Sequence, residues 1–256
     1  MNFKKSIILI FIFSCFILCV GAVSAENITA DDAQNVTQEN DISAGAVESA
    51  EVTSQKVSTK KIDTDTDADD MVVTYKKNNY FKVKVKNDDT DKPVKKLKLK
   101  LKVYTKSKSK TYYIKTNSKG VAKFNTKNLG LGNHKIVITS ADDSYIVNEN
   151  AYIFVGKKYT TTMKPNTVKK LKNKDALMVY TKNDGDEKEI KVAFKGTAKK
   201  SNIIKAVFYL KNKSTGKLIK KIDYTDDFEN GKWEYPDEDY SYKYEAVKVR
   251  ITYVTV

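Results

Sequence analysis

The run Lys-Lys-Leu-Lys-Leu-Lys-Leu-Lys-Val-Tyr at residues 95–104 decides the fold of this chain. Leu97, Leu99, Leu101 and Val103 alternate with a lysine at each intervening position. Successive side chains of a β-strand point to opposite faces, so this period of two places the apolar groups in a core and the ammonium groups outside it. In a helix the same leucines would be scattered around the circumference and would bury no common stripe. The run therefore predicts a strand with one buried face and one lysine-rich face.

Residues 80–86 alternate in the same way, with three apolar residues between lysines. We expect these apolar residues to face the same core as the leucines of 95–104. If the two strands pair, their outward lysines share one face. The lysines concerned are Lys82, Lys84, Lys98 and Lys100.

Turn residues divide the chain from residue 71 onward into short alternating runs. Seven runs within 71–157 predict an immunoglobulin-like antiparallel β-sandwich. A linker is expected around 156–158, and residues 158–256 predict a second, β-rich sandwich-like domain. The predicted strands are 71–75, 80–86, 96–104, 111–116, 121–125, 134–139, 151–155, 176–181, 189–195, 203–211, 217–224 and 242–256.

Residues 1–25 have the order of a secretory signal peptide: a basic start, an uncharged apolar run and a small-residue exit at Ala25. The alternative is an uncleaved leader that anchors the chain in the membrane, because the apolar run approaches the length of a span. Cys15 and Cys19 both lie in this leader. The exported part then contains no disulfide, zinc cluster or cysteine nucleophile, and we expect an extracellular or cell-surface protein.

Residues 26–70 form an acidic segment with a net charge of −9 and no aromatic residue. Such a composition cannot bury enough apolar surface to order the chain, so we expect a disordered linker. The remaining residues, 71–256, carry a net charge of +22. The charge difference suggests that the acidic segment folds back onto the basic one and competes with its anionic partners.

Four phrases of the sequence suggest a family. They are Tyr-Phe-Lys-Val-Lys-Val-Lys-Asn-Asp-Asp-Thr-Asp-Lys-Pro-Val at 80–94, Leu-Lys-Leu-Lys-Val-Tyr at 99–104, Lys-Thr-Asn-Ser-Lys-Gly-Val-Ala-Lys-Phe at 115–124 and Leu-Gly-Asn-His-Lys-Ile-Val-Ile at 131–138. Over 72–156 the chain resembles the immunoglobulin-like repeats of adhesin-like surface proteins from methanogenic archaea, and 175–185 is similar to a segment beside such repeats. The resemblance implies a secreted, non-enzymatic protein of the cell surface that acts in adhesion. This chain departs from the large adhesins in having one clear repeat.

The sequence offers little for catalysis or for metal binding. His134 is the single histidine and opens a strand, so we expect a structural role for it. We predict no catalytic residue, no metal site and no cofactor. The acidic clusters at 88–91, 142–143, 226–229 and 237–239 lie between strands, where aspartate is favoured by turn chemistry. An enzyme that uses these loop carboxylates on polysaccharide is an alternative, if they converge in a cleft.

The chain has 46 lysines and one arginine, Arg250. Proteins that bind specific nucleic-acid sequences depend on the bidentate hydrogen bonds of arginine, which lysine cannot make. With one arginine in the chain, we predict no specific nucleic-acid partner. An anionic cell-wall polymer or glycan is a better partner for an exported protein with many surface lysines. Other surface proteins are further predicted partners. We expect contact with the membrane only through an uncleaved leader. Two alternatives are that the modules are spacers of the envelope and that the lysines only keep sheet edges soluble. The predicted binding residues are Lys82, Lys84, Lys98, Lys100, Lys102 and Tyr113.

The glycosylation acceptor pattern Asn-X-Ser/Thr occurs three times. Two of the sites lie in the acidic segment, where a glycan would extend and protect the chain. The predicted acceptors are Asn27, Asn35 and Asn212.

Overall fold

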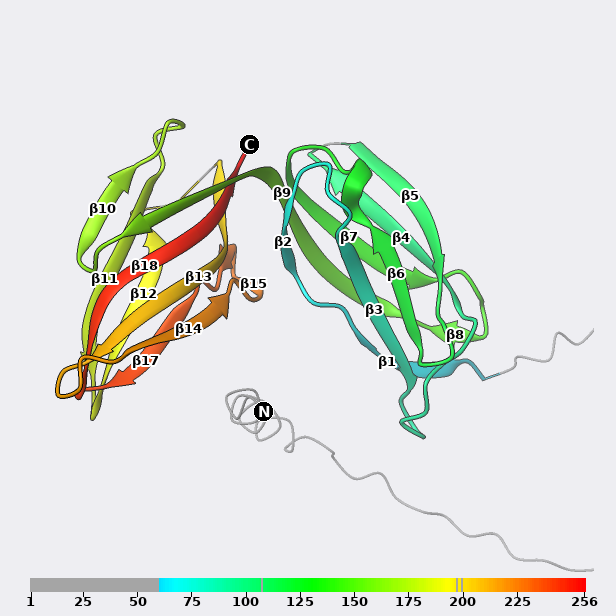
Figure 1. Ribbon diagram of the computed structural model, residues 1–256. Coiled ribbons are helices and arrows are strands. Elements are labelled where there is room, and N and C mark those ends of the chain that lie inside the picture. Colours follow the sequence, from blue (N-terminus) through cyan, green and yellow to red (C-terminus); the bar gives the residue numbers. More distant parts are fainter. Residues whose placement is uncertain (1–59, 107, 197, 199) are drawn as a thin grey trace, which may run out of the picture. The chain divides into compact units, whose positions relative to one another are not determined.

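The computed structural model describes residues 60–106, 108–196, 198 and 200–256 (Figure 1). These residues form eighteen strands and one short 3-10 turn, η1 (Thr126–Asn128), and no α-helix occurs among them. The prediction of an all-β chain is confirmed. Each of the twelve predicted runs overlaps a strand, because alternation of apolar and polar residues is the pattern of a half-buried sheet.

Two facing sheets enclose the first core. One has the strand order β6-β3-β1-β8, and the other contains β5-β4-β7-β9 with β2 beside β9. Most neighbours are antiparallel, but β1 runs parallel to β8 and β2 runs parallel to β9. The bounds are β1 (Ile62–Asp67), β2 (Met71–Thr74), β3 (Tyr80–Asn87), β4 (Lys98–Thr105), β5 (Lys108–Lys115), β6 (Val121–Asn125), β7 (Gly132–Ser140), β8 (Tyr145–Ile146) and β9 (Asn148–Met163).

The alternating leucines and valines meet in this first core. Phe81 of β3 is 1% exposed, and Leu99 and Leu101 of β4 are fully buried in the same cluster. The prediction that these two strands face one core is therefore confirmed. Each such side chain contributes about 1.5–3 kcal/mol by leaving water, so burial of this set dominates the stability of the sandwich.

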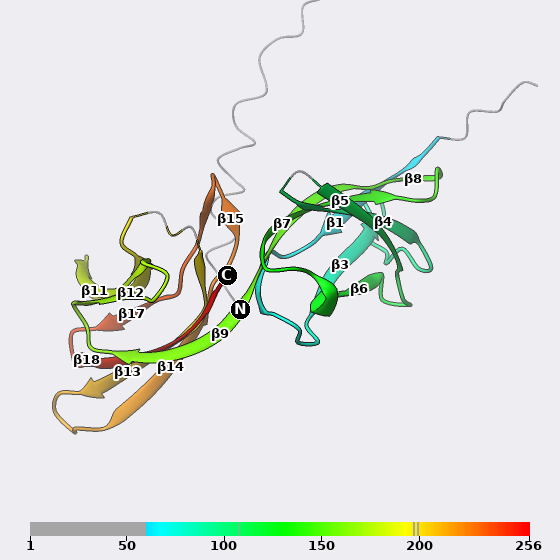
Figure 2. The ribbon, with the colours of Figure 1, turned by 90° about the horizontal axis from the view of Figure 1, so that it is seen from above.

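A second core lies between two further layers (Figure 2). One layer has the order β10-β11-β12-β17, and the other continues the large sheet through β9-β18-β13-β14. Phe208, Ile251 and Ile190 are fully buried between them. The bounds are β10 (Thr167–Lys170), β11 (Ala176–Asp184), β12 (Glu187–Phe194), β13 (Ser201–Asn212), β14 (Leu218–Tyr224), β15 (Phe228–Glu229), β16 (Lys232–Trp233), β17 (Asp237–Ser241) and β18 (Tyr244–Thr255).

The linker predicted around 156–158 is wrong, because these residues lie inside β9. The first half of β9 pairs with β7 and the second half pairs with β18. Gly156 permits the change of partner, since a Cβ there would lie 2.8 Å from Cβ of Val254 and 2.9 Å from the carbonyl oxygen of Thr255. β9 contributes Ala151 and Ile153 to the first core and Met163 to the second. One strand thus belongs to both sandwiches.

The predicted disordered linker is corrected at its carboxyl end, where β1 forms a strand. Ile62, Thr64 and Thr66 are half-buried and alternate with exposed aspartates. Ile62 is the one strongly apolar residue of this strand, so the sequence shows no apolar period of two there. Its backbone pairs with β3, and Asp65 and Asp67 lie opposite Lys86 and Lys84 of that strand. Residues 26–59 of the predicted linker lie outside the described residues.

Within the described part of the chain, no helix is long and apolar enough to cross a membrane. The predicted leader at 1–25 lies outside that part, and its prediction stands as made.

Candidate functional site

The two sets of predicted binding lysines lie on opposite sides of the first sandwich. Lys82 and Lys84 point outward from β3, whereas Lys98, Lys100 and Lys102 point outward from β4. The strands β3 and β4 belong to different sheets and do not pair, so the condition under which their lysines would share a face is not met. The cause is the shared core: two strands that face one core from opposite sheets turn their outer side chains away from each other.

The outer surface around β4 is basic and is called the β4 face. Lys100 lies opposite Tyr113 of β5 and Thr139 of β7, and Lys98 lies opposite Lys115. Directly opposite residues of an antiparallel pair project from the same face. The face has five lysines and no carboxylate, and among the described residues none of these lysines takes part in an ion pair. It comprises Lys98, Lys100, Lys102, Tyr104, Thr111, Tyr113, Lys115, Lys135, Val137 and Thr139.

Tyrosine rings hold two of these ammonium groups in place. Nζ of Lys98 is 4.7 Å from the ring centroid of Tyr113, and Nζ of Lys102 is 5.1 Å from that of Tyr104. Both distances are within the range of cation–π attraction. Tyr113 is 56% exposed, so its ring is accessible beside the lysines. Of the six predicted binding residues, the structure brings four together here: Lys98, Lys100, Lys102 and Tyr113.

The opposite surface, called the β3 face, is partly neutralised by β1. Asp67 lies opposite Lys84, and Asp65 lies opposite Lys86. The pKa of Lys86 is raised, first by its hydrogen bond and ion pair with Asp91 and to a smaller extent by the charges of Asp65 and Asp67. The two outer surfaces of the sandwich therefore differ in charge pairing. The β3 face comprises Lys82, Lys84, Lys86, Val121, Lys123, Asp65 and Asp67.

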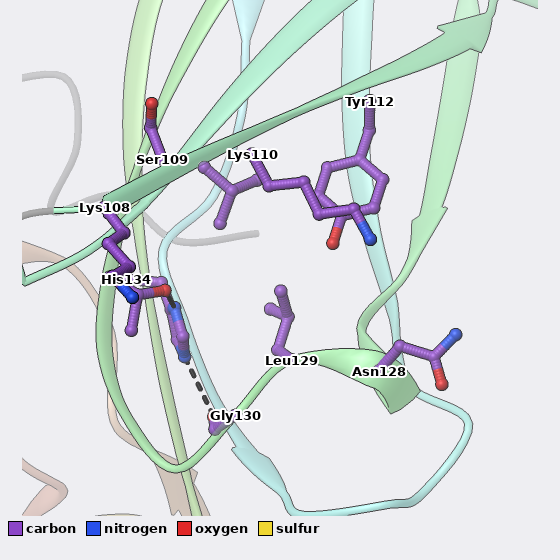
Figure 3. Close-up of a pocket in the computed structure, with 10 residues that line it drawn as sticks. Lys108, Ser109, Lys110, Tyr112, Asn128, Leu129, Gly130 and His134 are labelled. Carbon is purple, nitrogen blue, oxygen red and sulfur yellow. Dashed lines mark hydrogen bonds between the residues drawn. The ribbon is translucent and has the colours of Figure 1, made fainter.

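A pocket of about 240 Å³ opens at one end of the first sandwich (Figure 3). It lies between the core-facing side of β5 and the segment 128–130, which begins at the last residue of η1. Lys110 and Tyr112 reach it from β5, and Leu129 lies below them (Figure 3). The pocket residues come from β4, β5, the segment 128–130 and β7, and no motif joins them, so the sequence did not predict the pocket. The lining is Val103, Thr105, Lys108, Ser109, Lys110, Tyr112, Asn128, Leu129, Gly130 and His134.

His134 fixes one wall of this pocket. The residue is 1% exposed, with Nε2 2.9 Å from the carbonyl oxygen of Gly130 and Nδ1 2.9 Å from Oγ1 of Thr105. A carbonyl can only accept, so Nε2 carries the proton, and in the neutral ring Nδ1 accepts from the threonine hydroxyl. Both ring nitrogens have protein partners. This arrangement supports the expected structural role.

The acidic clusters are distributed over turns and strands. Oδ1 of Asp142 accepts a hydrogen bond from the backbone of Ser144, as turn chemistry predicts. Asp237, Glu238 and Asp239 lie in β17, where Asp237 is 3.8 Å from Nζ of Lys191. The described residues contain no group of three or more histidine, cysteine or acidic side chains that would hold a metal ion.

The described glycosylation acceptor, Asn212, stabilises a hairpin turn. Its Oδ1 accepts hydrogen bonds from the backbone N–H groups of Ser214 and Thr215. Glycosylation at Asn212 stays a prediction. Asn27 and Asn35 lie outside the described residues.

Two comparisons with known proteins give no match: no family model matches the chain, and no curated protein matches it. The predicted relation to surface proteins of methanogenic archaea therefore stays a prediction. The fold itself defines an all-β protein with two sandwich cores that share one strand.

Solved structures with partly similar architecture do exist. A tetra-tandem repeat from the extending region of a large adhesion protein has 7% identity and a TM-score of 0.26, over 71% of this chain and 40% of the other. The FN1–FN3 domains of chicken CNTN1 have 7% identity and a TM-score of 0.28, over 76% and 62%. A DUF3823 family protein from Bacteroides ovatus ATCC 8483 has 10% identity and a TM-score of 0.16, over 77% and 96%. At these TM-scores the likenesses assign no function.

Proposed function

We propose that this chain is an exported, cell-surface, adhesin-like protein that binds anionic wall polymer or acidic glycan through the β4 face, without catalysis. The observation that carries the proposal is the set of five lysines on one sheet surface with no carboxylate among them. Lys98 lies directly opposite Lys115, and like charges in that position destabilise a sheet. An anionic polymer along the strands would relieve this repulsion.

The contrast between the two outer surfaces supports the choice of site. On the β3 face, aspartates of the same chain lie opposite Lys84 and Lys86. On the β4 face the lysines have tyrosine rings as neighbours instead of acids. A rigid ring that is apolar on its body and polar at its tip suits a binding surface. We infer that a polymer binds the unneutralised surface.

The test compares two triple variants of the full chain that lose the same charge. Lys98→Gln/Lys100→Gln/Lys102→Gln alters the β4 face, and Lys82→Gln/Lys84→Gln/Lys123→Gln alters the β3 face. Since a lysine near an anionic surface contributes about 1 kcal/mol, the first triple should weaken binding to polygalacturonate and to isolated envelope at least tenfold. The second should weaken binding less than threefold. Duplex DNA is the comparison polyanion, across a salt series.

The proposal would be contradicted if the two triple variants lost the same affinity and if binding of all polyanions weakened equally in about 0.5 M salt. That outcome would favour the spacer alternative. Its structural support is β9, which pairs in both sandwiches without an intervening linker. A spacer needs a continuous connection between its modules but no ligand.

A further inference from the structure

We propose that the pocket between β5 and residues 128–130 binds one small carboxylate-bearing unit, such as an acidic sugar at the end of the polymer that the β4 face holds. The inference rests on the proposed function and adds a second subsite to it. Three features carry it: the size of the pocket, its lining and its connection to the β4 face.

The size suits a single small unit. Its volume of about 240 Å³ lies below the range of roughly 300–1,000 Å³ in which drug-sized ligands bind. A polymer cannot enter such a space, but one ring at its end can.

The lining combines an apolar floor with cationic groups and lacks carboxylates. Val103 and Leu129 are 2% and 5% exposed and form the floor. Lys108 and Lys110 lie on the core-facing side of β5, where the cover of the opposite sheet ends. Nζ of Lys110 lies 5.2 Å from the ring centroid of Tyr112 (Figure 3). An acidic sugar matches both parts, because its carboxylate can pair with an ammonium group while its C–H surface packs on the apolar floor.

The walls are fixed before any ligand enters. The bonds from His134 to Gly130 and Thr105 tie the segment 128–130 to β4 and β7. The ring of Tyr112 packs on Phe124 with 4.8 Å between centroids. Because these groups are already held, ligand binding needs little ordering of the protein. Figure 3 shows the Asn128 side chain directed away from Leu129.

The pocket and the β4 face use the two sides of one strand. Along β5, Lys110 and Tyr112 point toward the pocket, whereas Thr111 and Tyr113 point to the β4 face. β5 is the last strand at its end of the large sheet. A polymer that lies on the β4 face can therefore turn around this edge and place its terminal unit in the pocket.

The test titrates the full chain with monomeric galacturonate, neutral galactose and inorganic phosphate, with the signals of Leu129 and Tyr112 followed by NMR. Galacturonate should shift both signals, whereas galactose and phosphate should bind at least fivefold more weakly. Lys110→Gln should weaken galacturonate binding at least fivefold, and Tyr112→Phe tests the hydroxyl without loss of the ring. No binding of galacturonate, equal binding of the three probes, or no effect of Lys110→Gln would overturn the inference.

A matched control separates this inference from the proposed function. Lys98→Gln removes the same charge from the β4 face, so it should weaken polygalacturonate binding and leave monomeric galacturonate unaffected. If face variants weaken the polymer but the monomer does not bind, only the pocket assignment fails. If the monomer binds and face variants leave the polymer unaffected, the proposed function fails instead.

Discussion

Asp67 lies directly opposite Lys84 across the antiparallel pair formed by β1 and β3. Both side chains point away from the core, because the alternate residues of each strand point into it. The core side of β1 is polar, since Oγ1 of Thr64 is 3.1 Å from Oγ1 of Thr66. This strand therefore gains little from apolar burial and depends on backbone pairing and on charge. Asp65 and Asp67, at the carboxyl end of the acidic segment, therefore lie beside the lysines of the β3 face. Competition of the acidic segment with anionic partners stays a prediction.

The double variant Asp65→Asn/Asp67→Asn should raise the affinity for polygalacturonate at low salt. It uncovers the charges of Lys84 and Lys86, so we expect a gain of about twofold to fivefold that disappears as salt screens the surface. The measurement is the binding constant across a salt series. Asp186→Asn/Glu187→Gln removes the same charge from an exposed turn of the second sandwich. An equal gain in this control would show that net charge alone matters.

Much of the fold follows from local patterns in the sequence. Strands such as β3 and β4 were predictable, because an alternation of leucine or valine with lysine fits a strand with one buried face and one exposed face. The partner of each strand was not predictable, because pairing depends on which sheet a strand joins and the alternation is the same in both. For this reason the sequence left open whether Lys82 and Lys98 share a face, and the structure places them on opposite faces.

The candidate site was likewise predictable only in part. Tyr113 and Lys100 were predicted together, because both lie on strands that are neighbours in the sequence and pair with each other. The pocket needed the tertiary structure, since Lys110 and Leu129 meet only where the end of the sandwich is left open. β1 was missed because threonine in place of valine gives no apolar period.

Gly156→Ala should destabilise the fold. A Cβ at this position would lie 2.8 Å from Cβ of Val254 and 2.9 Å from the carbonyl oxygen of Thr255, so the pairing of β9 with β18 must shift. Overpacking of this kind costs about 1–3 kcal/mol, to be measured by urea unfolding. Gly130→Ala is the control, because nothing lies within 4 Å of its added Cβ. A loss of stability as large at Gly130 would contradict this account of β9.

His134 should have its proton on Nε2, as a two-dimensional proton–nitrogen spectrum of the ring can show. The reason is that the carbonyl of Gly130 can only accept, which leaves Nδ1 to accept from Thr105. Thr105→Val removes that donor and should cost about 1–3 kcal/mol, because it leaves a buried nitrogen without a partner. Thr111→Val, on the exposed β4 face, should change stability by less than about 0.5 kcal/mol. A proton found on Nδ1 in the neutral ring would refute the assignment.

Asp70 joins segments of the two sandwiches through its carboxylate. Oδ1 accepts a hydrogen bond from the backbone N–H of Tyr152 in β9, and Oδ2 accepts one from that of Phe228 in β15, at 2.7 Å. The rings of Tyr152 and Phe228 pack with 4.5 Å between centroids. The pKa of Asp70 is raised above 3.8, chiefly by burial and also by the charges of Asp69 and Asp226, although the two hydrogen bonds oppose the shift.

Asp70→Asn should destabilise the protein by about 1–3 kcal/mol, because an amide cannot accept both backbone hydrogen bonds. The difference in stability between the wild type and this variant should depend on pH. A carboxyl whose pKa is raised on folding stabilises the fold fully below its unfolded value of 3.8, and this contribution is lost as pH rises through the folded pKa. The wild type therefore exceeds the variant by more at pH 3 than at pH 7 in urea unfolding. Asp69→Asn, at an exposed neighbour, should change stability by less than about 0.5 kcal/mol. If the stability lost in Asp70→Asn grew with pH instead, the charged carboxylate would be the form that the fold favours at this position.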